Sequence, residues 1–178
     1  MDFSFRLTTP ADIPDILSFE RTNRRFFEKT VPPRPSAYFD TPTAFRDKMV
    51  ALLGEQRDGK FLMFIILSND QAVIARVNIT IDDSHSATLG FRCAENQKGK
   101  GLIAKALIRI LPAVVRDYQI HNFVAFAAKN NPASTITLLN AGFLIVEGAQ
   151  RAVHLNDAAL CLQKFENPRL TDKLANFS

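Results

Sequence analysis

The segment with the clearest capacity for chemistry is the turn Lys98-Gly99-Lys100-Gly101, between a strand-like and a helix-like stretch. Glycines let the backbone approach a ligand closely, and the first amides of a helix are unpaired donors at the positive end of its dipole. That arrangement suits a pyrophosphate, and the two lysines add positive charge at the same rim. We therefore predict a phosphate-binding turn, with simple capping of the helix start as the structural alternative.

Two familiar phosphate-binding motifs can be tested against the same letters. A P-loop needs Ser or Thr after the Gly-Lys pair, whereas Gly99-Lys100 is followed by Gly101. The segment Gly99–Ala104 does fit a loose dinucleotide pattern, but that pattern expects a parallel strand-helix-strand unit with an acid ending the second strand. Hairpins precede the turn here, and no acid ends the strand-like segment Phe123–Ala127. Neither motif is favoured.

The composition predicts one domain covering residues 1–178. Hydrophobic residues make up 47% of the 178 and charged residues 22%, which is typical of a globular chain that buries a core. No apolar run approaches the roughly 18 residues of a membrane span, and residues 1–6 lack the features of a secretory signal. We expect a cytoplasmic protein without membrane contact.

The formal charge of +4 favours an anionic partner without identifying it. The sequence has no arginine-rich tail or basic repeat, so direct nucleic-acid binding is not expected. The two cysteines, Cys93 and Cys161, lie in apolar strand-like segments and are expected to be reduced core thiols. The three histidines lack the spacing and the cysteine company of a zinc site, so no metal is expected.

The elements that must position the turn follow from periodicity and from proline and glycine signals. Helices are predicted over 10–27, from Pro42 to about Gly54, after Gly101, and over 132–141; Pro112 should kink or end the third of them. Strands are predicted over residues 3–7, 61–67, 72–81, 87–93, 123–127, 143–146 and 158–165. This order describes an α/β (α+β) chain with a mixed sheet and helices on its faces.

Several further segments give the turn a specific context. They are similar, in order and approximate spacing, to the GNAT acetyltransferase superfamily: Leu89-Gly90-Phe91-Arg92, the turn through Ile103, Asn131-Pro132-Ala133-Ser134, Leu139 and Gly142-Phe143. More narrowly, the chain resembles the Rim-type enzymes that acetylate the N-terminal alanine of ribosomal proteins, through Asn130–Ser134, Ala141–Phe143, Glu147-Gly148 and Leu155-Asn156-Asp157. Lys98 and Ile103 depart from the superfamily pattern, which usually has Gln or Arg and a small residue there.

The resemblance implies a fold and a reaction. The fold is a mostly antiparallel central sheet with one splayed parallel pair and helices on both faces. The reaction is transfer of acetyl from acetyl-CoA to an amine by direct attack, without a metal and without an acetyl-enzyme. It also implies a set of cofactor-binding residues: Phe91, Arg92, Cys93, Lys98, Gly99, Lys100, Gly101, Leu102, Asn131 and Ser134.

The chemistry needs a base for the protonated amine and a proton for the departing thiolate. By resemblance Ser134 supplies that proton, although a serine at this position can equally bond backbone in the first turn of a helix. For the base, Glu147 and His154 are the candidates, with Glu95 a third and a water relay as the alternative.

The acceptor side is predicted from Arg24, Arg34 and Tyr38, in and after the first helix, where the resemblance places a substrate groove. Basic residues there would suit an acidic peptide. The Rim-type resemblance implies a protein N-terminus as the acceptor, and the enzyme is expected to be a monomer or a homodimer. Two alternatives stay open: a small-molecule amine such as an aminoglycoside, polyamine or amino acid, and a GNAT-like module that binds coenzyme A without catalysis.

Overall fold

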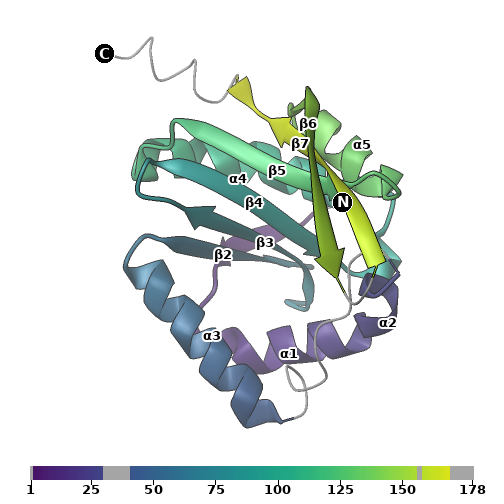
Figure 1. Ribbon diagram of the computed structural model, residues 1–178. Coiled ribbons are helices and arrows are strands. Elements are labelled where there is room, and N and C mark those ends of the chain that lie inside the picture. The colour runs from purple at the N-terminus through teal and green to yellow at the C-terminus, as the bar shows by residue number, and fades with distance from the viewer. Residues whose placement is uncertain (1, 30–40, 156–157, 169–178) are drawn as a thin grey trace. The chain divides into compact units, whose positions relative to one another are not determined.

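The computed structural model describes residues 2–29, 41–155 and 158–168, and for residues 153–155 and 158–160 the backbone alone. The strands and the main helices follow one another along the chain in the order expected from the sequence (Figure 1). The elements are β1 (Ser4–Leu7), η1 (Pro10–Asp12), α1 (Ile13–Thr22), α2 (Arg24–Phe27), α3 (Pro42–Arg57), β2 (Phe61–Leu67), β3 (Val73–Ile81), β4 (Ser86–Cys93), η3 (Glu95–Gln97), α4 (Leu102–Tyr118), β5 (Asn122–Ala128), α5 (Pro132–Asn140), β6 (Leu144–Leu155) and β7 (Ala158–Glu166).

The strands form one seven-stranded sheet in the order β1-β2-β3-β4-β5-β7-β6. β1 with β2, β5 with β7 and β6 with β7 are antiparallel pairs, whereas β4 and β5 run parallel. The predicted α/β class, with a mostly antiparallel sheet and one parallel pair, is confirmed.

The chain forms two compact units, and each is described by itself. The first unit comprises Met1–Asn78 and Phe91–Lys98, and the second comprises Ile79–Gly90 and Gly99–Ser178. β3 and β4 each have residues in both units, because the unit boundaries fall within these strands. A single domain over residues 1–178 stays a prediction.

The core of the first unit lies where α1 and α3 pack against β2 (Figure 1). Ile16 from α1, Phe45 and Met49 from α3, and Ile65 from β2 are fully buried there. The start of α3 follows the sequence signal, since the Thr41 hydroxyl accepts a hydrogen bond from the Ala44 amide at 3.0 Å. The helix continues to Arg57, beyond the predicted end at Gly54.

The prediction of one helix over residues 10–27 is wrong in detail. The segment is divided into η1, α1 and α2, and α1 ends before Asn23, which has φ −99° and ψ 6°. The buried Asn23 side chain donates from Nδ2 to the Phe19 carbonyl at 2.9 Å. A short amide side chain that bonds nearby backbone competes with helical hydrogen bonding, which explains the break.

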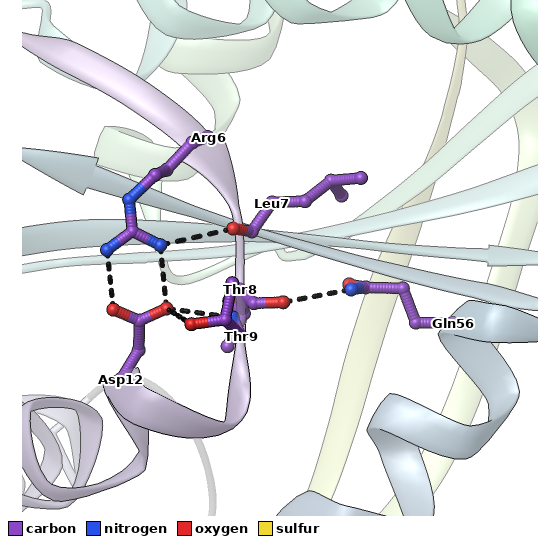
Figure 2. Close-up of polar contacts among 6 residues, drawn as sticks. All are labelled: Arg6, Leu7, Thr8, Thr9, Asp12 and Gln56. Atoms are coloured by element: carbon purple, nitrogen blue, oxygen red, sulfur yellow. Dashed lines mark hydrogen bonds and ion pairs between the residues drawn. The ribbon is translucent and has the colours of Figure 1, made fainter.

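The junction of β1 and η1 is fixed by polar contacts around Thr9 (Figure 2). The Asp12 carboxylate accepts from the Thr9 amide and the Thr9 hydroxyl, each at 2.8 Å, and it also binds Arg6. On the other side, Gln56 of α3 donates from Nε2 to the Thr8 carbonyl at 2.9 Å. These bonds satisfy backbone groups that neither β1 nor the short helix can pair.

In the second unit, α4 contacts α5, and α5 contacts β5 and β6. Pro112 lies inside α4, which continues to Tyr118, so the helix is not ended there. β6 runs from Leu144 to Leu155 and is much longer than the predicted strand 143–146.

Two further expectations are answered by the described residues. The two cysteines are free thiols, as expected. Cys93 is half-buried and Cys161 is exposed, so the prediction that they are core residues is wrong. Cys161 lies near the sheet edge on β7, where its Sγ donates to Gln150 Oε1 at 3.5 Å. No helix in the described ranges combines the length and the apolar character needed to cross a bilayer.

Candidate functional site

The parallel strands β4 and β5 pair over a short length. The register extends from Ser86 opposite Asn122 to Leu89 opposite Ala125. Both strands continue beyond this point, β4 to Cys93 and β5 to Ala128, while β7 pairs with the opposite edge of β5 from Val124 to Ala128. Phe91 to Cys93, which are among the predicted cofactor-binding residues, therefore lie in the part of β4 beyond its described pairing with β5.

The glycine turn has the backbone conformation that its sequence predicted. Gly99 has φ +75° and Gly101 has φ +68°, values that side-chain-bearing residues rarely adopt. Gly101 is the N-cap of α4, and its carbonyl accepts the first helical hydrogen bond from Lys105 at 3.1 Å. A Cβ placed on either glycine would meet no other part of the protein within 4 Å, so the space that a side chain would occupy at these positions is open.

The start of α4 has the chemistry of an anion site. The first turn of the helix contains no acidic residue, and Gly101 caps it without a side-chain hydrogen bond. The amides of residues 102–104 are thus donors without an intrahelical acceptor, at the positive end of a 17-residue helix. The side chains of Leu102, Ile103 and Ala104 are buried and anchor this turn in the core.

The two positions that depart from the superfamily pattern have different surroundings. Ile103 is 5% exposed, so its extra volume lies among core residues. Lys98 is exposed and its Nζ lies 5.9 Å from the centroid of the Phe26 ring. Lys100 is also exposed, so both lysines present charge at the surface beside the turn.

Sequence reasoning missed a buried charge cluster in the first unit. The Glu20 carboxylate of α1 is fully buried, with Oε1 2.8 Å from Arg76 Nη2 and Oε2 2.6 Å from Arg92 Nη1. Arg76 comes from β3 and is 2% exposed, and Arg92 comes from β4 and is 17% exposed. Arg76 gave no clear signal, because Asn78 and Thr80 follow it at every second position of β3, a pattern that ordinarily predicts a solvent-facing side.

Two more contacts link the helical segment of α1 and α2 to the end of β4 and the residues that follow it. The Arg92 guanidinium carbon lies 4.9 Å from the centroid of the Phe27 ring, a cation–π arrangement. Asn23 Oδ1 accepts a hydrogen bond from the Glu95 amide at 2.9 Å. Glu95 itself is exposed and lies 3.8 Å from Lys29, as a surface ion pair.

Asn131 and Ser134 lie at the start of α5 in the second unit. Asn131 is the N-cap, and its Oδ1 accepts from the Ser134 amide at 3.2 Å, so its side chain caps the helix. Ser134 is half-buried, and its hydroxyl has no hydrogen-bond partner among the described residues. That hydroxyl is therefore available to a ligand.

The candidate bases lie on β6. Glu147 is exposed and falls in a register irregularity between Ile145 and Gln150, which also contains Gly148 at φ +71°. The backbone of His154 pairs with Ala159 of β7. Among the described residues, no group of three or more His, Cys, Asp or Glu side chains could hold a metal ion.

The predicted acceptor-side residues are only partly described. Arg24 is in α2, where its Nε lies 2.8 Å from Glu28 Oε1 in an ion pair one helical turn apart. Arg34 and Tyr38 lie outside the described residues.

The parallel pair of β4 and β5, the glycine turn and the N-terminus of α4 together define an α/β protein with a candidate anion-binding turn. The family described as "Acetyltransferase (GNAT) domain" matches residues 3–144. The match covers well over half of the 178 residues, so the chain belongs to the GNAT acetyltransferase domain family. The superfamily predicted from the turn and from the Asn131 segment is confirmed.

Similar proteins include acetyltransferases with different acceptors. The ribosomal-protein-serine acetyltransferase of Escherichia coli K12 is 27% identical over 97 residues, 54% of each chain, so the chain spans about half the length of this curated relative. The structure of the ribosomal-protein-S5-alanine acetyltransferase of Vibrio fischeri aligns with a TM-score of 0.85 at 21% identity, over 93% of this chain and 92% of that one. The spermidine N-acetyltransferase of Vibrio cholerae, in complex with CoA and spermine, aligns with a TM-score of 0.73 at 16% identity, over 92% and 94%.

Proposed function

We propose that this chain is an N-acetyltransferase that transfers acetyl from acetyl-CoA to the α-amine of a protein N-terminus, of the ribosomal-protein class. The observation that carries the proposal is the open glycine turn at the start of α4, where Gly101 leaves the first helical amides without acceptors. Membership of the GNAT acetyltransferase family supports it. The acceptor class is supported by the ribosomal-protein acetyltransferase from Escherichia coli.

The chain offers groups for each part of acetyl-CoA. The amides of residues 102–104 would hold the pyrophosphate, and the exposed ammonium groups of Lys98 and Lys100 would add charge beside it. The backbone of Phe91 to Cys93, beyond the described β4–β5 pairing, would hydrogen-bond the thioester carbonyl. Bound there, acetyl-CoA supplies the activated acetyl group.

Proton movements are assigned to three side chains. Ser134, whose hydroxyl has no partner among the described residues, would protonate the departing thiolate. Glu147, exposed on β6, or His154 on the same strand would accept the proton of the incoming ammonium. Asn131 would act by holding the first turn of α5, since its carboxamide oxygen is already used as a cap.

Calorimetry with acetyl-CoA followed by a thiol-release assay tests the proposal. The acceptors should include peptides with the N-terminal sequences of ribosomal proteins, the same peptides with a blocked α-amine, and spermidine. Binding together with thiol release only from the free α-amine is expected. Absence of acetyl-CoA binding, or binding without turnover on any amine, would overturn it.

A small-molecule amine is the second candidate acceptor. The fold shared with the Vibrio cholerae spermidine N-acetyltransferase favours it. Preferential thiol release with spermidine would establish this candidate. Loss of acetylation from a ribosomal protein in cells lacking the chain would establish the first.

A further inference from the structure

The buried carboxylate of Glu20 bridges two strands through two arginines. Its oxygens lie 2.8 Å from Arg76 on β3 and 2.6 Å from Arg92 on β4. Removing such ions from water carries a large desolvation penalty, and apolar residues of similar volume are often as stabilising. Stability alone therefore gives a weak reason for this cluster, and its geometry points to a positioning role.

Arg92 is held from more than one side. Glu20 binds one of its terminal nitrogens, and the Phe27 ring lies 4.9 Å from its guanidinium carbon. Phe27 is itself buried against Phe19 of α1, with ring centroids 5.6 Å apart. The orientation of the Arg92 side chain is thus fixed by the Glu20 carboxylate and by the Phe27 ring, two kinds of contact that a planar guanidinium favours.

The same helices also hold the chain just after Arg92. Asn23, at the break between α1 and α2, accepts the Glu95 amide at 2.9 Å, and the Ala94 amide donates to the Ile74 carbonyl of β3 at 2.9 Å. The end of β4 is therefore tied through its side chain at Arg92 and through its backbone at Ala94 and Glu95.

We propose that Glu20 is a positioning residue for acetyl transfer, acting through Arg92 to fix the backbone of Phe91 to Cys93 against the thioester carbonyl. The inference rests on the proposed function, because that function assigns this backbone to the carbonyl. Hydrogen-bond donors stabilise a developing oxyanion only when they are held in place before reaction. Glu20 provides that constraint without contacting the substrate.

Glu20→Gln is the direct test. The amide presents a donor where Arg76 or Arg92 needs an acceptor, so Arg92, the more exposed of the two arginines, loses its fixed position. We expect kcat to fall about 10- to 100-fold, the scale of a misplacement near 1 Å. The KM for acetyl-CoA should change by less than about threefold, because the phosphate-binding amides of residues 102–104 are outside the cluster.

Two further variants separate positioning from stability. Met49→Ala is the matched control, since Met49 is fully buried in the same unit but belongs to the core between α1, α3 and β2. It should lower Tm without changing kcat per folded molecule, counted by the stoichiometry of CoA binding. Arg92→Lys keeps the charge opposite Glu20 but loses the planar fork and its contact with Phe27, so it should lower kcat as Glu20→Gln does.

The outcomes distinguish the two levels of inference. A wild-type protein without thiol release would overturn the proposed function. If the wild type is active, an unchanged kcat in Glu20→Gln would overturn the role of Glu20. The role of Glu20 would also be overturned if Met49→Ala lowered kcat in the same proportion to its loss of Tm as Glu20→Gln does. Should Glu20→Gln not fold, Arg92→Lys decides, because a wild-type kcat in that folded variant would refute positioning through Arg92.

Discussion

Arg6 and Asp12 form a two-pronged ion pair between β1 and the start of the first helical segment. Nη2 of the arginine lies 2.6 Å from Oδ1 of the carboxylate, and Nη1 lies 2.7 Å from Oδ2 (Figure 2). The hydrogen bonds from Arg6, with those from Thr9, lower the pKa of Asp12 from 3.8 to about 2. The side chain of Asp12 is 7% exposed, whereas that of Arg6 is 47% exposed.

This pair predicts a pH-dependent contribution to stability. Because the pKa of Asp12 is lower in the folded chain than its ordinary value of 3.8, the contribution is complete above that value and is lost as pH falls toward about 2. Asp12→Asn should therefore reduce the free energy of unfolding at neutral pH by about 1–2 kcal/mol, allowing for solvent screening at Arg6. Urea unfolding at decreasing pH should show this difference shrinking through the same window.

Asp117→Asn provides the control for a generic charge effect. Asp117 lies 2.8 Å from Arg116, but both side chains are largely exposed, so its replacement should have little effect on stability. A difference between Asp12→Asn and wild type that stays constant with pH would show that the ion pair is not its source.

Gly101→Ala should be destabilising through backbone strain alone. Gly101 has φ +68° and ψ 13°, and an added Cβ would meet no atom within 4 Å. The left-handed conformation should reduce the free energy of unfolding by about 1–2 kcal/mol. Gly54→Ala, inside α3, is the matched control and should be stabilising by about 0.5–1 kcal/mol, since its nearest neighbour would be Arg57 at 3.9 Å. Chemical denaturation measures both, and equal stabilities would argue against a fixed turn.

Asn131→Ala and Ser134→Ala should separate a structural role from a chemical one. Asn131→Ala removes the acceptor of the Ser134 amide and should reduce the free energy of unfolding by about 1 kcal/mol. Ser134→Ala should change stability by no more than about 0.5 kcal/mol but lower kcat by about 100-fold. Thermal melts measure the stability effect, and thiol release measures the effect on kcat. Asn131→Asp is the control, because its carboxylate retains the cap. Wild-type turnover in Ser134→Ala would remove it from the mechanism.

Local patterns predicted most elements because their causes are local. Residues 61–67 form β2 as predicted, and Thr41-Pro42 starts α3, since apolar runs and cap signals act within a few residues. The predicted strand 143–146 ends before Glu147-Gly148, so β6 was predicted too short. In the structure, Gly148 at φ +71° allows a bulge, and the strand continues beyond it.

The charge cluster was beyond the reach of sequence patterns. Glu20 and Arg92 are 72 positions apart, and no periodicity relates a helical glutamate to an arginine at the end of a strand. A charged residue in an amphipathic helix is ordinarily assigned to the solvent face, whereas Glu20 is fully buried. The glycine turn was predictable because its function depends on backbone conformation, which two glycines and the following helix specify locally.

Pro112→Ala should be stabilising. Pro112 is exposed inside the continuous helix α4, and its ring nitrogen cannot donate to the carbonyl four residues earlier. Alanine restores that bond and should increase the free energy of unfolding by about 1–2 kcal/mol. The gain is less than the full helix-propensity difference, because the unfolded chain also regains flexibility. Urea unfolding measures the change.

Lys105→Pro is the reciprocal control in the same helix. Lys105 is exposed, and its amide donates to the Gly101 carbonyl at 3.1 Å, so proline there should be destabilising by about 3 kcal/mol. Val114 and Val115 are both buried in the last turns of α4. If Lys105→Pro is destabilising but Pro112→Ala is neutral or destabilising, the packing of these two side chains depends on the bend that proline favours in a helix. Proline would then be a packing residue of α4, because the alanine helix would gain a hydrogen bond and lose the fit of its apolar face.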